Sequence, residues 1–598
     1  MERMKLFIKS TGYSVKLIYA SSKLTMVFYL LLNIIAMTFP LINLYIMKKF
    51  LDELTLKKPD ITYIILYISL YFGIIILNQA TNSSTQILNN SIQEKGKHKY
   101  DADLAEKFSK LPLSVIDTSV GRDLINEVKY SQWTAVGLTQ TLIWTISSIY
   151  SFFVAFVALL LFNIPFSLLF IALIVPGIII DVVFERKSED FRRKTAPDVR
   201  KFCYYRWMLT DAWPAKDVRM YDLTEPIKKR YDVEKDTYRK ANKFLDLKKL
   251  RSSLFAETIK RSGEIIFIVF IILQAINGKI TIGDIALYTG FISTAFDFFQ
   301  GTVQNLAFSY TVYTDRMKRV FEFESIECPD ETGGTRRIDK FESLSFENVY
   351  FKYPFAENHV LCGTSFTLNR GDKLSIVGIN GAGKSTIIKL MIGLYQIESG
   401  QILINGYPMT EYNIKNVREM FSALFQNFVQ YPLSLRDNIA LSDIKKRDED
   451  GEITEALKQS GIYGEYDKFD NDLDTYMTRQ FDDNGAELSK GQWQKIALSR
   501  AYFKNADIII FDEPSAALDA EAEDLIFKSF ENISKNKTGI MISHRISSAK
   551  LSNKVIVLDG GKISESGTHE ELIAKDGLYA KLYNLQMEKY TVKEGDEG

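Results

Sequence analysis

The sequence contains little cysteine and no excess of positive charge. Its three cysteines, Cys203, Cys328 and Cys362, lie far apart in a chain of 598 residues, so they support neither a disulfide framework nor a zinc site. The 74 lysines and arginines are balanced by 74 aspartates and glutamates. Because nucleic-acid-binding domains are normally basic, this balance argues against a protein dedicated to nucleic acid.

Apolar residues are abundant, and they are unevenly distributed. Long apolar runs are confined to residues 1 to about 310, whereas the remainder has the composition of a soluble α/β protein. A helix needs about 20 apolar residues to cross the roughly 30 Å of hydrocarbon in a bilayer. We therefore predict six membrane spans, at residues 25–47, 61–80, 141–162, 167–184, 263–276 and 285–308. The fifth run is short enough to be a buried soluble helix, but its hairpin with the sixth favours a span.

The segments between the spans predict the orientation. Residues 81–140 and 185–262 are long and charged, whereas residues 163–166 and 277–284 form very short connections. Basic residues precede the first span, which is too long for a cleaved signal peptide, and they favour a cytoplasmic N-terminus. An even number of spans then returns the C-terminal half to the cytoplasm. Four lysines disagree, because this orientation places them in an external loop: Lys48, Lys49, Lys57 and Lys58.

The second half contains a glycine loop between an apolar strand and a helix, KLSIVGINGAGKSTIIKLMIGLY at residues 373–395. The loop satisfies the pattern G-x-x-x-x-G-K-[ST] with Gly378, Gly383, Lys384 and Ser385. Glycines allow successive backbone N–H groups to turn inward around phosphate oxygens, and the helix N-terminus adds a partial positive charge. A lysine at that positive end is unfavourable unless an anion neutralises it, so Lys384 itself indicates a phosphate ligand.

A second strand, ADIIIFDEP at residues 506–514, ends in two carboxylates. Buried parallel strands have this pattern, and they deliver their last residues to the sheet edge where ligands bind in α/β folds. Asp512 would hold Mg²⁺ through water, because magnesium keeps several waters and takes few protein ligands. Glu513 would polarise an attacking water. The alternative is a pair of solvated charges at a strand end.

Further motifs surround these two in a definite order. Gln426 lies in ALFQNF after the phosphate loop, LSKGQ (488–492) precedes the second strand, and SAALD (515–519) follows it. MISHR places His544 after another strand, and Tyr353, ahead of the phosphate loop, can stack on a base. This succession resembles the ATP-binding-cassette (ABC) ATPases. Joined to six upstream spans, it is similar to a half-size ABC exporter.

The resemblance implies an all-α, six-helix transmembrane domain of the type I ABC exporter kind, fused to an α/β P-loop nucleotide-binding domain. The transmembrane domain would comprise residues 1–325 and the nucleotide-binding domain residues 343–587. Residues 326–342 would be a linker and residues 588–598 a polar tail. The chain would be a multi-pass protein of a bacterial cytoplasmic membrane, with its ATPase domain in the cytoplasm.

The resemblance also implies roles for single residues. Glu513 and His544 would be catalytic, and a purely structural histidine is the alternative for His544. The ligands of Mg²⁺ would be Ser385, Gln426 and Asp512. The residues expected to contact ATP are Tyr353, Gly378, Asn380, Gly381, Gly383, Lys384, Ser385, Thr386, Gln426, Ser489, Gly491, Gln492 and Asp519. Tyr350 and Phe351 are neighbours that could be mistaken for the stacking Tyr353.

Two copies are expected to assemble head to tail, with ATP between the phosphate loop of one copy and LSKGQ of the other. A homodimer is expected because every motif is present in one chain, and a heterodimer is the alternative. Ser489 suits an N-cap, so the following helix offers its positive end to an anion. Lys490 departs from the glycine that is usual in the family. We expect its side chain to face solvent, and added charge near the γ-phosphate is the alternative.

Coupling between ATPase and membrane domain requires short helices at the tips of the two long cytoplasmic segments. The candidates are residues 111–122 and 206–222, which contain turn signals within helical flanks. Replacing Gly121 or Asp211 is therefore predicted to uncouple ATPase activity from stimulation by substrate.

The transported substrate is indicated by one side chain and by short local stretches. An acid within a span is costly in lipid and usually faces a cavity or a partner, so Asp297 could bind a cationic peptide or drug. Pairing with a basic group of another span is the alternative for Asp297. The same path could be lined by Gln304, Asn305, Gln274 and Asn33.

Stretches such as GQWQKIALSRA and FQNFVQYPLSLRDNI are similar to exporters of lantibiotics and related modified peptides. About twenty residues precede the first span, so no peptidase domain is expected ahead of it. We therefore expect ATP-driven export of a modified peptide such as a lantibiotic or bacteriocin. The alternatives are a lipid flippase, a multidrug exporter, and an ATP-gated channel or sensor.

Overall fold

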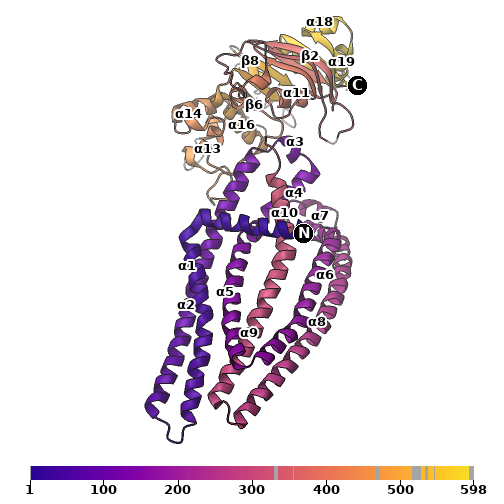
Figure 1. Cartoon of the computed structure of the whole chain (residues 1–598). Coiled ribbons are helices and arrows are strands. Elements are labelled where there is room, and N and C mark those ends of the chain that lie inside the picture. The colour runs from indigo at the N-terminus through magenta and orange to yellow at the C-terminus, as the bar shows by residue number, and fades with distance from the viewer. Residues whose placement is uncertain are drawn as a thin grey trace. The chain divides into compact units, whose positions relative to one another are not determined.

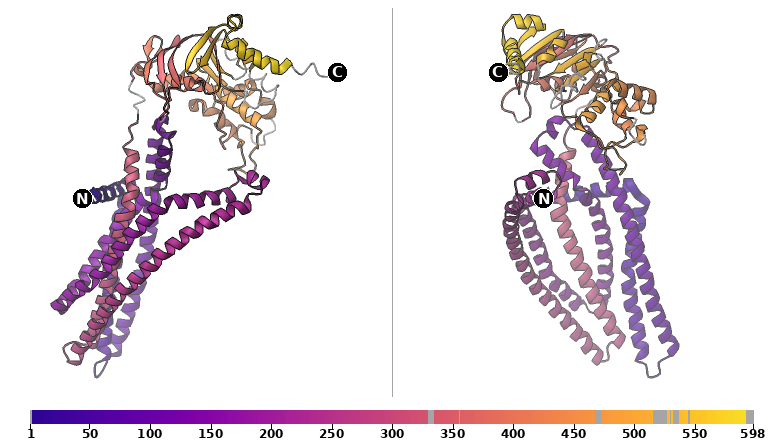
Figure 2. Two further views of the ribbon diagram at one scale, coloured as in Figure 1. Left: turned by 90° about the vertical axis from the view of Figure 1, so that its right-hand side faces the viewer. Right: turned by 180° about the vertical axis from the view of Figure 1, so that it is seen from behind.

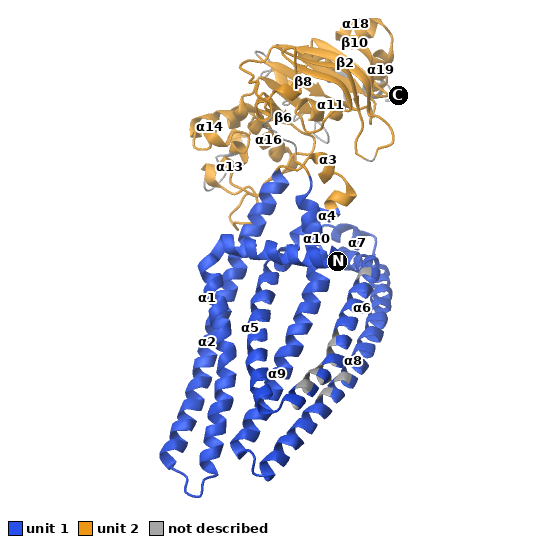
Figure 3. Cartoon of the chain, in the orientation of Figure 1, with its two compact units in different colours: residues 1–109, 123–326 blue, residues 110–122, 327–598 orange. Residues whose placement is uncertain are grey.

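The structure is a computed structural model of the whole chain. It describes residues 2–328, 334–354, 356–466, 472–514, 527–528, 530–531, 537–543 and 546–591. The chain divides into two compact units (Figure 3). Unit 1 comprises residues 1–109 and 123–326, and unit 2 comprises residues 110–122 and 327–598. Residues 110–122 therefore fold with unit 2, although helices of unit 1 precede and follow them in the sequence.

Unit 1 is built from long helices (Figure 1). In the part of the chain that the structure describes, six of them have 27 residues or more: α1 (Glu2–Leu54), α2 (Ile61–Ser109), α5 (Gln132–Phe162), α6 (Ile164–Thr210), α8 (Thr224–Ile276) and α9 (Ile282–Phe308). Shorter helices are α4 (Ser119–Lys129), α7 (Ala215–Met220) and α10 (Thr314–Glu324), which follows a π-helical turn at Ser309–Tyr313. Among the described residues, α1, α2 and α5 contain a window apolar and long enough to cross a membrane. The expected all-α fold with six long helices is confirmed.

The helices continue well beyond their apolar stretches. At about 1.5 Å per residue, α2 is roughly 70 Å long, more than twice the thickness of a bilayer core. Its apolar residues 61–80 are followed by nearly thirty helical residues up to Ser109. In the same way, α6 and α8 carry much of the charged segment 185–262 as unbroken helix, and they lie side by side (Figure 2).

Helix α1 is two helices joined at a break. Ser22 has non-helical dihedral angles (φ −163°, ψ 62°), and residues 2–21 run crosswise to the rest of α1 (Figure 1). This first segment is buried along one side by residues such as Ser14 and Ile18. The hydroxyls of Ser14 and Thr139 of α5 are hydrogen-bonded 2.8 Å apart. The apolar pattern of the sequence does not predict this break, because it marks only the start of the first span.

The core of unit 1 lies where α1, α5, α8 and α9 meet. Its buried residues are Leu41, Ala155, Leu159, Phe267, Ile271, Leu287, Phe291, Ile292, Ala295 and Phe296. Large apolar side chains also cover the outside of the long helices, α2 and α5 among them. Leu161 is 85% exposed and Ile76 is 68% exposed. A water-soluble protein rarely exposes apolar patches of this extent, whereas a helix surrounded by lipid does so at no cost.

Unit 2 contains two sheets. The six-stranded sheet has the order β10-β9-β3-β8-β7-β6, and its strands are β3 (Lys373–Gly378), β6 (Phe421–Leu424), β7 (Ile508–Asp512), β8 (Thr538–Ile542), β9 (Lys554–Asp559) and β10 (Lys562–Gly567). The four-stranded sheet has the order β2-β1-β4-β5, with β1 (Ser343–Phe351), β2 (Leu361–Asn369), β4 (Ser399–Ile404) and β5 (Tyr407–Pro408). In the larger sheet β3, β6, β7, β8 and β9 are parallel, and only β10 is antiparallel to its neighbour.

The helices of unit 2 pack around these sheets. They are α3 (Leu113–Ile116), α11 (Lys384–Met391), α12 (Ile414–Glu419), α13 (Leu435–Ala440), α14 (Asp450–Gln459), α15 (Tyr463–Tyr466), α16 (Lys490–Lys504), α18 (His569–Ala574) and α19 (Leu578–Thr591). One core lies between the two sheets, and a second joins α13, α14 and α16 through residues such as Leu457 and Trp493. The expected α/β nucleotide-binding fold is confirmed.

Strand order decides which residues meet at the edge of the larger sheet. Strand β8 lies between β3 and β7, with Ile376 beside Ile542 on one side and Asp512 beside Ile542 on the other. All five residues of β7 and of β8 are buried, as in parallel strands covered on both faces. The carboxyl ends of β3 and β7 therefore reach the same sheet edge, and the glycine loop and the two carboxylates follow them there.

Candidate functional site

The phosphate loop connects β3 to α11 and depends on its glycines. Gly383, the N-cap of α11, has φ +104°, a left-handed conformation that side chains rarely adopt. A Cβ on Gly378 would lie 2.3 Å from the carbonyl oxygen of Leu558 in the neighbouring strand β9. Asn380 and Gly381 lie exposed in the same loop, and Thr386 is buried in the first turn of α11. The loop therefore has the backbone freedom that a phosphate-binding turn requires.

Lys384 lies inside this loop and contacts its carbonyl groups. Its Nζ donates to the carbonyl oxygens of Gly378, at 3.0 Å, and Ile379, at 3.1 Å. Burial lowers the pKa of Lys384, while the nearby carboxylates of Glu513 and Asp512 oppose that shift. A buried ammonium at a helix N-terminus is electrostatically costly, and an anion bound in the loop would offset that cost.

Asp512 and Glu513 occupy the end of β7 in different environments. Asp512 is 8% exposed, and burial raises its pKa, although the hydrogen bond that Ser385 Oγ donates to its Oδ1 (3.2 Å) opposes the shift. Glu513 is the first residue after strand β7. It has a left-handed φ of +49°, which is an uncommon conformation for a residue with a side chain. Its N–H donates to the carbonyl oxygen of Ile542 at 2.9 Å, which holds it against β8.

Gln426 joins the same group from the other side. Its Nε2 donates to Glu513 Oε2 at 2.7 Å. Lys384, Ser385, Gln426, Asp512 and Glu513 are thus brought together by β3, α11, β6 and β7. The motifs predicted this gathering, and strained backbone at Glu513 is typical of a functional site.

The tyrosine expected to stack on adenine lies beside the phosphate loop. The hydroxyls of Tyr353 and Thr386 are hydrogen-bonded 3.0 Å apart, and Lys389 Nζ lies 5.3 Å from the centre of the Tyr353 ring. Phe351, a neighbour that could be mistaken for it, is 3% exposed and belongs to the core. The other, Tyr350, has the ring of His359 beside it, at 5.9 Å between centres. Tyr353 is therefore the aromatic residue that the structure brings to the loop.

The LSKGQ stretch begins α16 as expected. Ser489 is the N-cap, and it forms a capping box with Gln492: the N–H of Gln492 donates to Ser489 Oγ at 3.3 Å, and the N–H of Ser489 donates to Gln492 Oε1 at 2.7 Å. Ser489 and Lys490 are exposed, and a Cβ on Gly491 would meet nothing within 4 Å. The first turn of α16 is therefore open to solvent. The side chain of Gln492 is held in the capping box, where it accepts a hydrogen bond from the N–H of Ser489.

Two predicted site residues cannot be placed. Asp519 and His544 lie outside the described residues. The strand before His544, β8, ends at Ile542 beside Asp512, so the chain arrives at the same sheet edge. The roles expected of both residues stay predictions.

A contact between residues 110–122 and the nucleotide-binding fold was not predicted. Tyr395, which follows α11, donates a hydrogen bond from its hydroxyl to Asp117, at the C-terminal end of α3. Burial and this hydrogen bond raise the pKa of Tyr395. Its ring meets that of Tyr353 edge to face, with 5.3 Å between their centres. Asp117 and Tyr395 are 278 residues apart, so no local pattern in the sequence indicates their contact.

The second predicted coupling segment carries exposed aromatic residues. Helix α7 follows Trp213, which is 80% exposed and stacks on Trp207 at 5.9 Å between ring centres. Met220 is 76% exposed and Tyr221 is 64% exposed. Short helices are therefore present within both predicted segments, as α3 and as α7.

The predicted substrate residues lie on α9. Asp297 and Gln304 are both exposed and are seven residues apart, so they share one face of the helix. Asn305 is exposed beside them, whereas Gln274 is half-buried on α8. Asn33 is buried, and its Nδ2 donates to the carbonyl oxygen of Tyr29 at 2.8 Å, so it serves its own helix.

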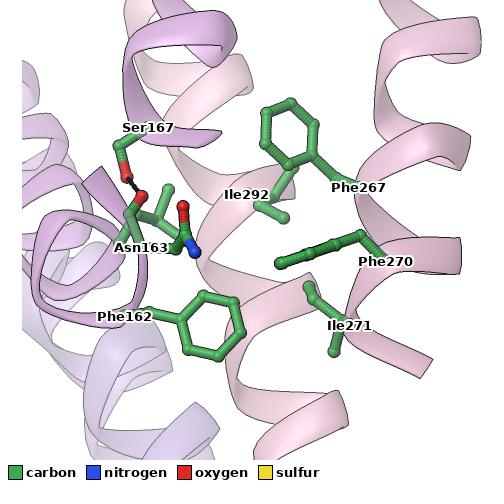
Figure 4. Close-up of a pocket in the computed structure, with 8 residues that line it drawn as sticks. Phe162, Asn163, Ser167, Phe267, Phe270, Ile271 and Ile292 are labelled. Atoms are coloured by element: carbon green, nitrogen blue, oxygen red, sulfur yellow. Dashed lines mark hydrogen bonds between the residues drawn. The ribbon is translucent and has the colours of Figure 1, made fainter. Parts of the chain in front are cut away.

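A small crevice lies between α5, α6, α8 and α9 (Figure 4), and none of these predicted substrate residues lines it. It is lined by Leu159, Phe162, Asn163, Ser167, Phe267, Phe270, Ile271 and Ile292. Its free volume is about 10 Å³, which is about what one water molecule needs. Such a space holds no peptide, so it is a packing feature of the core.

Comparison with known proteins adds the family context. The profile of the family described as "ABC transporter transmembrane region" matches residues 24–298, and that described as "ABC transporter" matches residues 361–516. The "Subtilin transport ATP-binding protein SpaT" of Bacillus subtilis is 29% identical over 97% of this chain and 95% of that protein. The "Nisin transport ATP-binding protein NisT" of Lactococcus lactis subsp. lactis is 28% identical, with 95% of each chain covered.

Two further proteins are similar to this chain, one over less than half of its length and one over nearly all of it at low sequence identity. An "ATP-dependent lipid A-core flippase" of Haemophilus ducreyi is 35% identical over 45% of each chain. A solved structure described as "a bacterial Atm1-family ABC exporter with ATP bound" has a TM-score of 0.75 and 20% identity, and covers 95% of this chain and 99% of that chain. At this identity the likeness shows the fold alone.

Proposed function

Because the chain belongs to the ABC transporter family, with the membrane region and the ATPase region in one polypeptide, we propose that it exports a modified peptide of the lantibiotic type. The family makes the chain an ATPase coupled to transmembrane transport and embeds it in the membrane by several passes. The observation that supports a peptide as the substrate is how much of the chain the similarity covers. The subtilin and nisin transport proteins match along nearly the whole chain, membrane region included.

A lipid flippase is the second candidate. The lipid A-core flippase is more similar in percentage identity, but the match covers less than half of each chain. Substrate choice depends on the membrane helices, and a match over so little of the chain says less about them than a match from end to end.

In the proposed ATPase, the residues gathered at the sheet edge have separate roles in binding and hydrolysing ATP. The glycine loop and Lys384 bind the phosphates, and Tyr353 stacks on the adenine. Glu513 lies beyond the strand end, fixed by Ile542 and Gln426, where it can accept a proton from a water that attacks the γ-phosphate. His544 and Asp519 keep the catalytic and interface roles that the motifs predict for them.

The same residues fit a magnesium ion. Ser385, Gln426 and Asp512 offer a hydroxyl, an amide oxygen and a carboxylate, which are the oxygen ligands that magnesium prefers. Ser385 and Asp512 are already in contact, and the buried carboxylate carries a raised pKa that a nearby cation would lower. Bound there, the ion would neutralise charge on the β- and γ-phosphates.

Dimerisation completes the proposed site. The first turn of α16 exposes Ser489 and Lys490, and the phosphate loop already has its own glycines, lysine and hydroxyl, so we assign this turn to the nucleotide of a second copy of the chain. The exposed Trp213, Met220 and Tyr221 around α7 support the same arrangement, because large apolar side chains outside a membrane span usually mark an interface. All motifs lie in one chain, so a homodimer suffices, with a heterodimer as the alternative.

Transport by reconstituted protein tests the proposal. The full chain is placed in liposomes, and uptake of a fluorescently labelled nisin precursor is measured with external ATP and magnesium, beside the Glu513→Gln variant. We expect ATP-dependent accumulation above the external concentration, and none with Glu513→Gln. Flipping of a fluorescent phospholipid without peptide uptake would identify a flippase. Peptide movement that only equilibrates the two sides would identify a gated channel.

The role of Asp297 is tested in the same assay. Asp297→Asn removes the charge and keeps the shape, so uptake of the cationic peptide should fall several-fold while basal ATPase activity stays within about twofold. Gln304→Ala, on the same face of α9, should have a smaller effect. Unaltered uptake of every cationic peptide by Asp297→Asn would remove Asp297 from the substrate path.

A further inference from the structure

The chain around Gln426 has little regular structure of its own. Within the described range 356–466, residues 425–433 form neither helix nor strand, so their backbone groups need partners outside the regular ladders. Gln426 nevertheless donates from Nε2 to Glu513 Oε2 at 2.7 Å. The position of its amide must therefore be set by contacts that the neighbouring residues make.

Helix α16 holds the chain on both sides of Gln426. Four residues before it, the hydroxyl of Ser422 on β6 donates to the carbonyl oxygen of Ala501 at 3.2 Å. Three residues after it, the carbonyl oxygen of Val429 accepts a hydrogen bond from Nη1 of Arg500 at 3.1 Å. Because residues 500 and 501 are neighbours on α16, one turn of a single helix fixes both flanks of Gln426.

Arg500 also acts through Asn438, a fully buried residue of α13. Its Nε donates to the carbonyl oxygen of Asn438 and its Nη2 donates to Oδ1 of the same residue, both at 2.8 Å. A guanidinium can only donate, so this contact fixes which end of the Asn438 amide carries the oxygen. The amide nitrogen, Nδ2, donates to the carbonyl oxygens of Tyr431 at 3.0 Å and Leu433 at 3.1 Å. Arg500 thus holds three carbonyl groups of residues 427–433, one directly and two through Asn438.

The guanidinium of Arg500 carries its charge in an unfavourable place. Burial lowers the pKa of Arg500, and the ring of Tyr431 lies beside the guanidinium, 5.2 Å from its centre. Among the described residues, the hydrogen-bond acceptors of Arg500 are backbone and amide oxygens, and none is a carboxylate. A buried charge without a counter-ion is costly to the folded state. The planar fork of donors offsets that cost, because it reaches acceptors in two segments at once.

The same helix also contacts the chain next to Glu513. Gln494 of α16 is 7% exposed, and its Nε2 donates to the carbonyl oxygen of Pro514, the residue after Glu513. Helix α16 is therefore bonded beside both members of the Gln426–Glu513 pair. The separation of the amide from the carboxylate depends on this one helix.

We propose that Arg500 is a positioning residue of the ATPase, which holds residues 427–433 on α16 so that Gln426 keeps its amide against Glu513 and its oxygen toward magnesium. Nε2 of Gln426 is engaged by Glu513, so Oε1 is the atom of that amide left for the metal. Arg500 acts through the backbone of this segment and not by contact with ATP. The inference rests on the proposed function, because only a magnesium-dependent ATPase uses that oxygen.

Hydrogen exchange tests the positioning without nucleotide or metal. Arg500→Lys keeps the charge, but a single ammonium group cannot reach Val429 and both oxygens of Asn438 together. Amide exchange is measured by mass spectrometry in the full chain in nanodiscs. We expect peptides covering residues 427–438 to exchange faster by about fivefold or more, and peptides covering β9 to change by less than about twofold. Faster exchange in both regions, or in neither, overturns the proposal.

The magnesium dependence of ATP hydrolysis tests the consequence for catalysis. In Arg500→Lys, the magnesium concentration that gives half the maximal rate should rise about fivefold or more, and kcat should fall about tenfold. The Kd for ATP without magnesium should change by less than about twofold, because the phosphate loop is untouched. Mn²⁺ binding with ATP in the Glu513→Gln background, followed by electron paramagnetic resonance, should weaken by the same factor as the magnesium requirement. An unaltered metal requirement overturns the proposal.

Arg418→Lys is the matched control. Arg418 also donates to backbone carbonyl oxygens, those of Ile392 at 3.3 Å and Gly393 at 3.1 Å, but these residues follow α11 and not Gln426. Its metal requirement should stay within about twofold of that of the unchanged chain. A rise equal to that of Arg500→Lys would overturn the assignment to Arg500.

A second variant is used if Arg500→Lys fails to fold. Asn438→Asp keeps the oxygen that accepts from Arg500 and supplies a counter-ion, but it loses the donor to Tyr431 and Leu433. It should show faster exchange at residues 427–433 and a raised metal requirement, and the absence of both overturns the proposal.

Hydrolysis by the unchanged chain separates the two hypotheses. If that chain hydrolyses no ATP with magnesium, the proposed function fails. If it hydrolyses ATP and Arg500→Lys behaves like it in exchange and in metal requirement, only the role of Arg500 fails.

Discussion

The two units of this chain place their polar groups in different ways. In unit 2, the groups proposed for catalysis gather at one edge of a parallel sheet, where Ser385 contacts Asp512 and Gln426 contacts Glu513. In unit 1, polar groups are spread along helices and pair across seams, as Lys48 does with Asp284 and Ser14 with Thr139. These polar side chains of unit 2 therefore surround the proposed ATP site, whereas the pairs named in unit 1 join one helix to another.

The contrast follows from what each unit packs against. Unit 2 has a buried apolar core, and the carboxylates proposed for catalysis lie where the buried strand β7 ends and the backbone turns back to solvent. Unit 1 exposes apolar side chains along its helices, so its polar groups are turned toward other helices. Substitutions in unit 2 should therefore change the chemistry, and substitutions where the two units join in sequence should change the coupling.

The largest effect should come from Glu513. Glu513→Gln keeps the shape and the backbone turn but removes the proton acceptor, so kcat for ATP hydrolysis should fall by roughly 10²–10⁴-fold. The Kd for ATP should change less than threefold, because the phosphate loop is untouched. Steady-state hydrolysis and equilibrium ATP binding by the reconstituted chain give both numbers.

Glu487→Gln is the matched control, because Glu487 is exposed near the start of α16. It should retain activity within about twofold. If both variants lost ATPase activity equally, the loss would come from removing a negative charge in general. Glu513 would then not act as a positioned general base.

A substitution at Gly121 tests the role of residues 110–122, which belong to unit 2 but lie between helices of unit 1 in the sequence. A Cβ on Gly121 would lie 2.0 Å from the carbonyl oxygen of Val115 and 2.7 Å from Thr118 Oγ1, so Gly121→Ala must distort the turn after α3. Asp117, which accepts the hydrogen bond of Tyr395, lies in that turn. We expect basal ATPase activity within about threefold and a loss of most of its stimulation by peptide.

Gly451→Ala is the control for this substitution. Gly451 lies on α14, and a Cβ there would meet nothing within 4 Å. Stimulation should survive in Gly451→Ala. If Gly121→Ala is stimulated as strongly as the unchanged chain, residues 110–122 do not couple the units.

The sequence predicted the two units unequally. The glycine loop, Lys384 and the two carboxylates were recognisable because short motifs fix their spacing, and strand order then brings them together. The six long helices were recognisable from apolar length. Contacts between distant segments could not be predicted, because nothing near Tyr395 or Lys48 in the sequence indicates Asp117 or Asp284 as the partner. The break at Ser22 was not predicted either, because the apolar pattern marks the start of the first span and not a change in helix direction.

Asp512 provides a smaller, thermodynamic test of the same contrast. Burial raises its pKa in the folded state, so the folded chain binds this proton more tightly than the unfolded chain does. The contribution of this group to stability is therefore greatest at low pH and is lost as the pH rises through the raised pKa. Asp512→Asn lacks the charge, so without magnesium at pH 7 it should melt about 2–4 °C higher, the shift that roughly 1 kcal/mol produces in a domain of this size.

The advantage of Asp512→Asn should shrink as the pH falls through the raised pKa of Asp512, as thermal unfolding in nanodiscs would measure. Asp507→Asn, at the exposed start of the same strand, is the control and should show no such trend. If the advantage of Asp512→Asn instead grows as the pH falls, the charged form of Asp512 is stabilised by its hydrogen-bond partners. Burying this carboxylate at the end of β7 would then cost no more free energy than placing it on the surface.

The smallest effect is expected at Lys490, where unit 2 is open to solvent. Lys490 is exposed in the first turn of α16, and a side chain there makes no contact that the helix requires. Lys490→Gly should therefore change ATPase activity less than twofold and lower stability by at most about 1 kcal/mol, the cost of glycine in a helix. Ser489→Ala, which removes the cap, should cost about 0.5–2 kcal/mol and reduce activity further, because the hydroxyl is proposed to reach the partner's nucleotide. If Lys490→Gly abolishes hydrolysis, the lysine is part of the site that two chains build together, and the open face of α16 is where its charge acts.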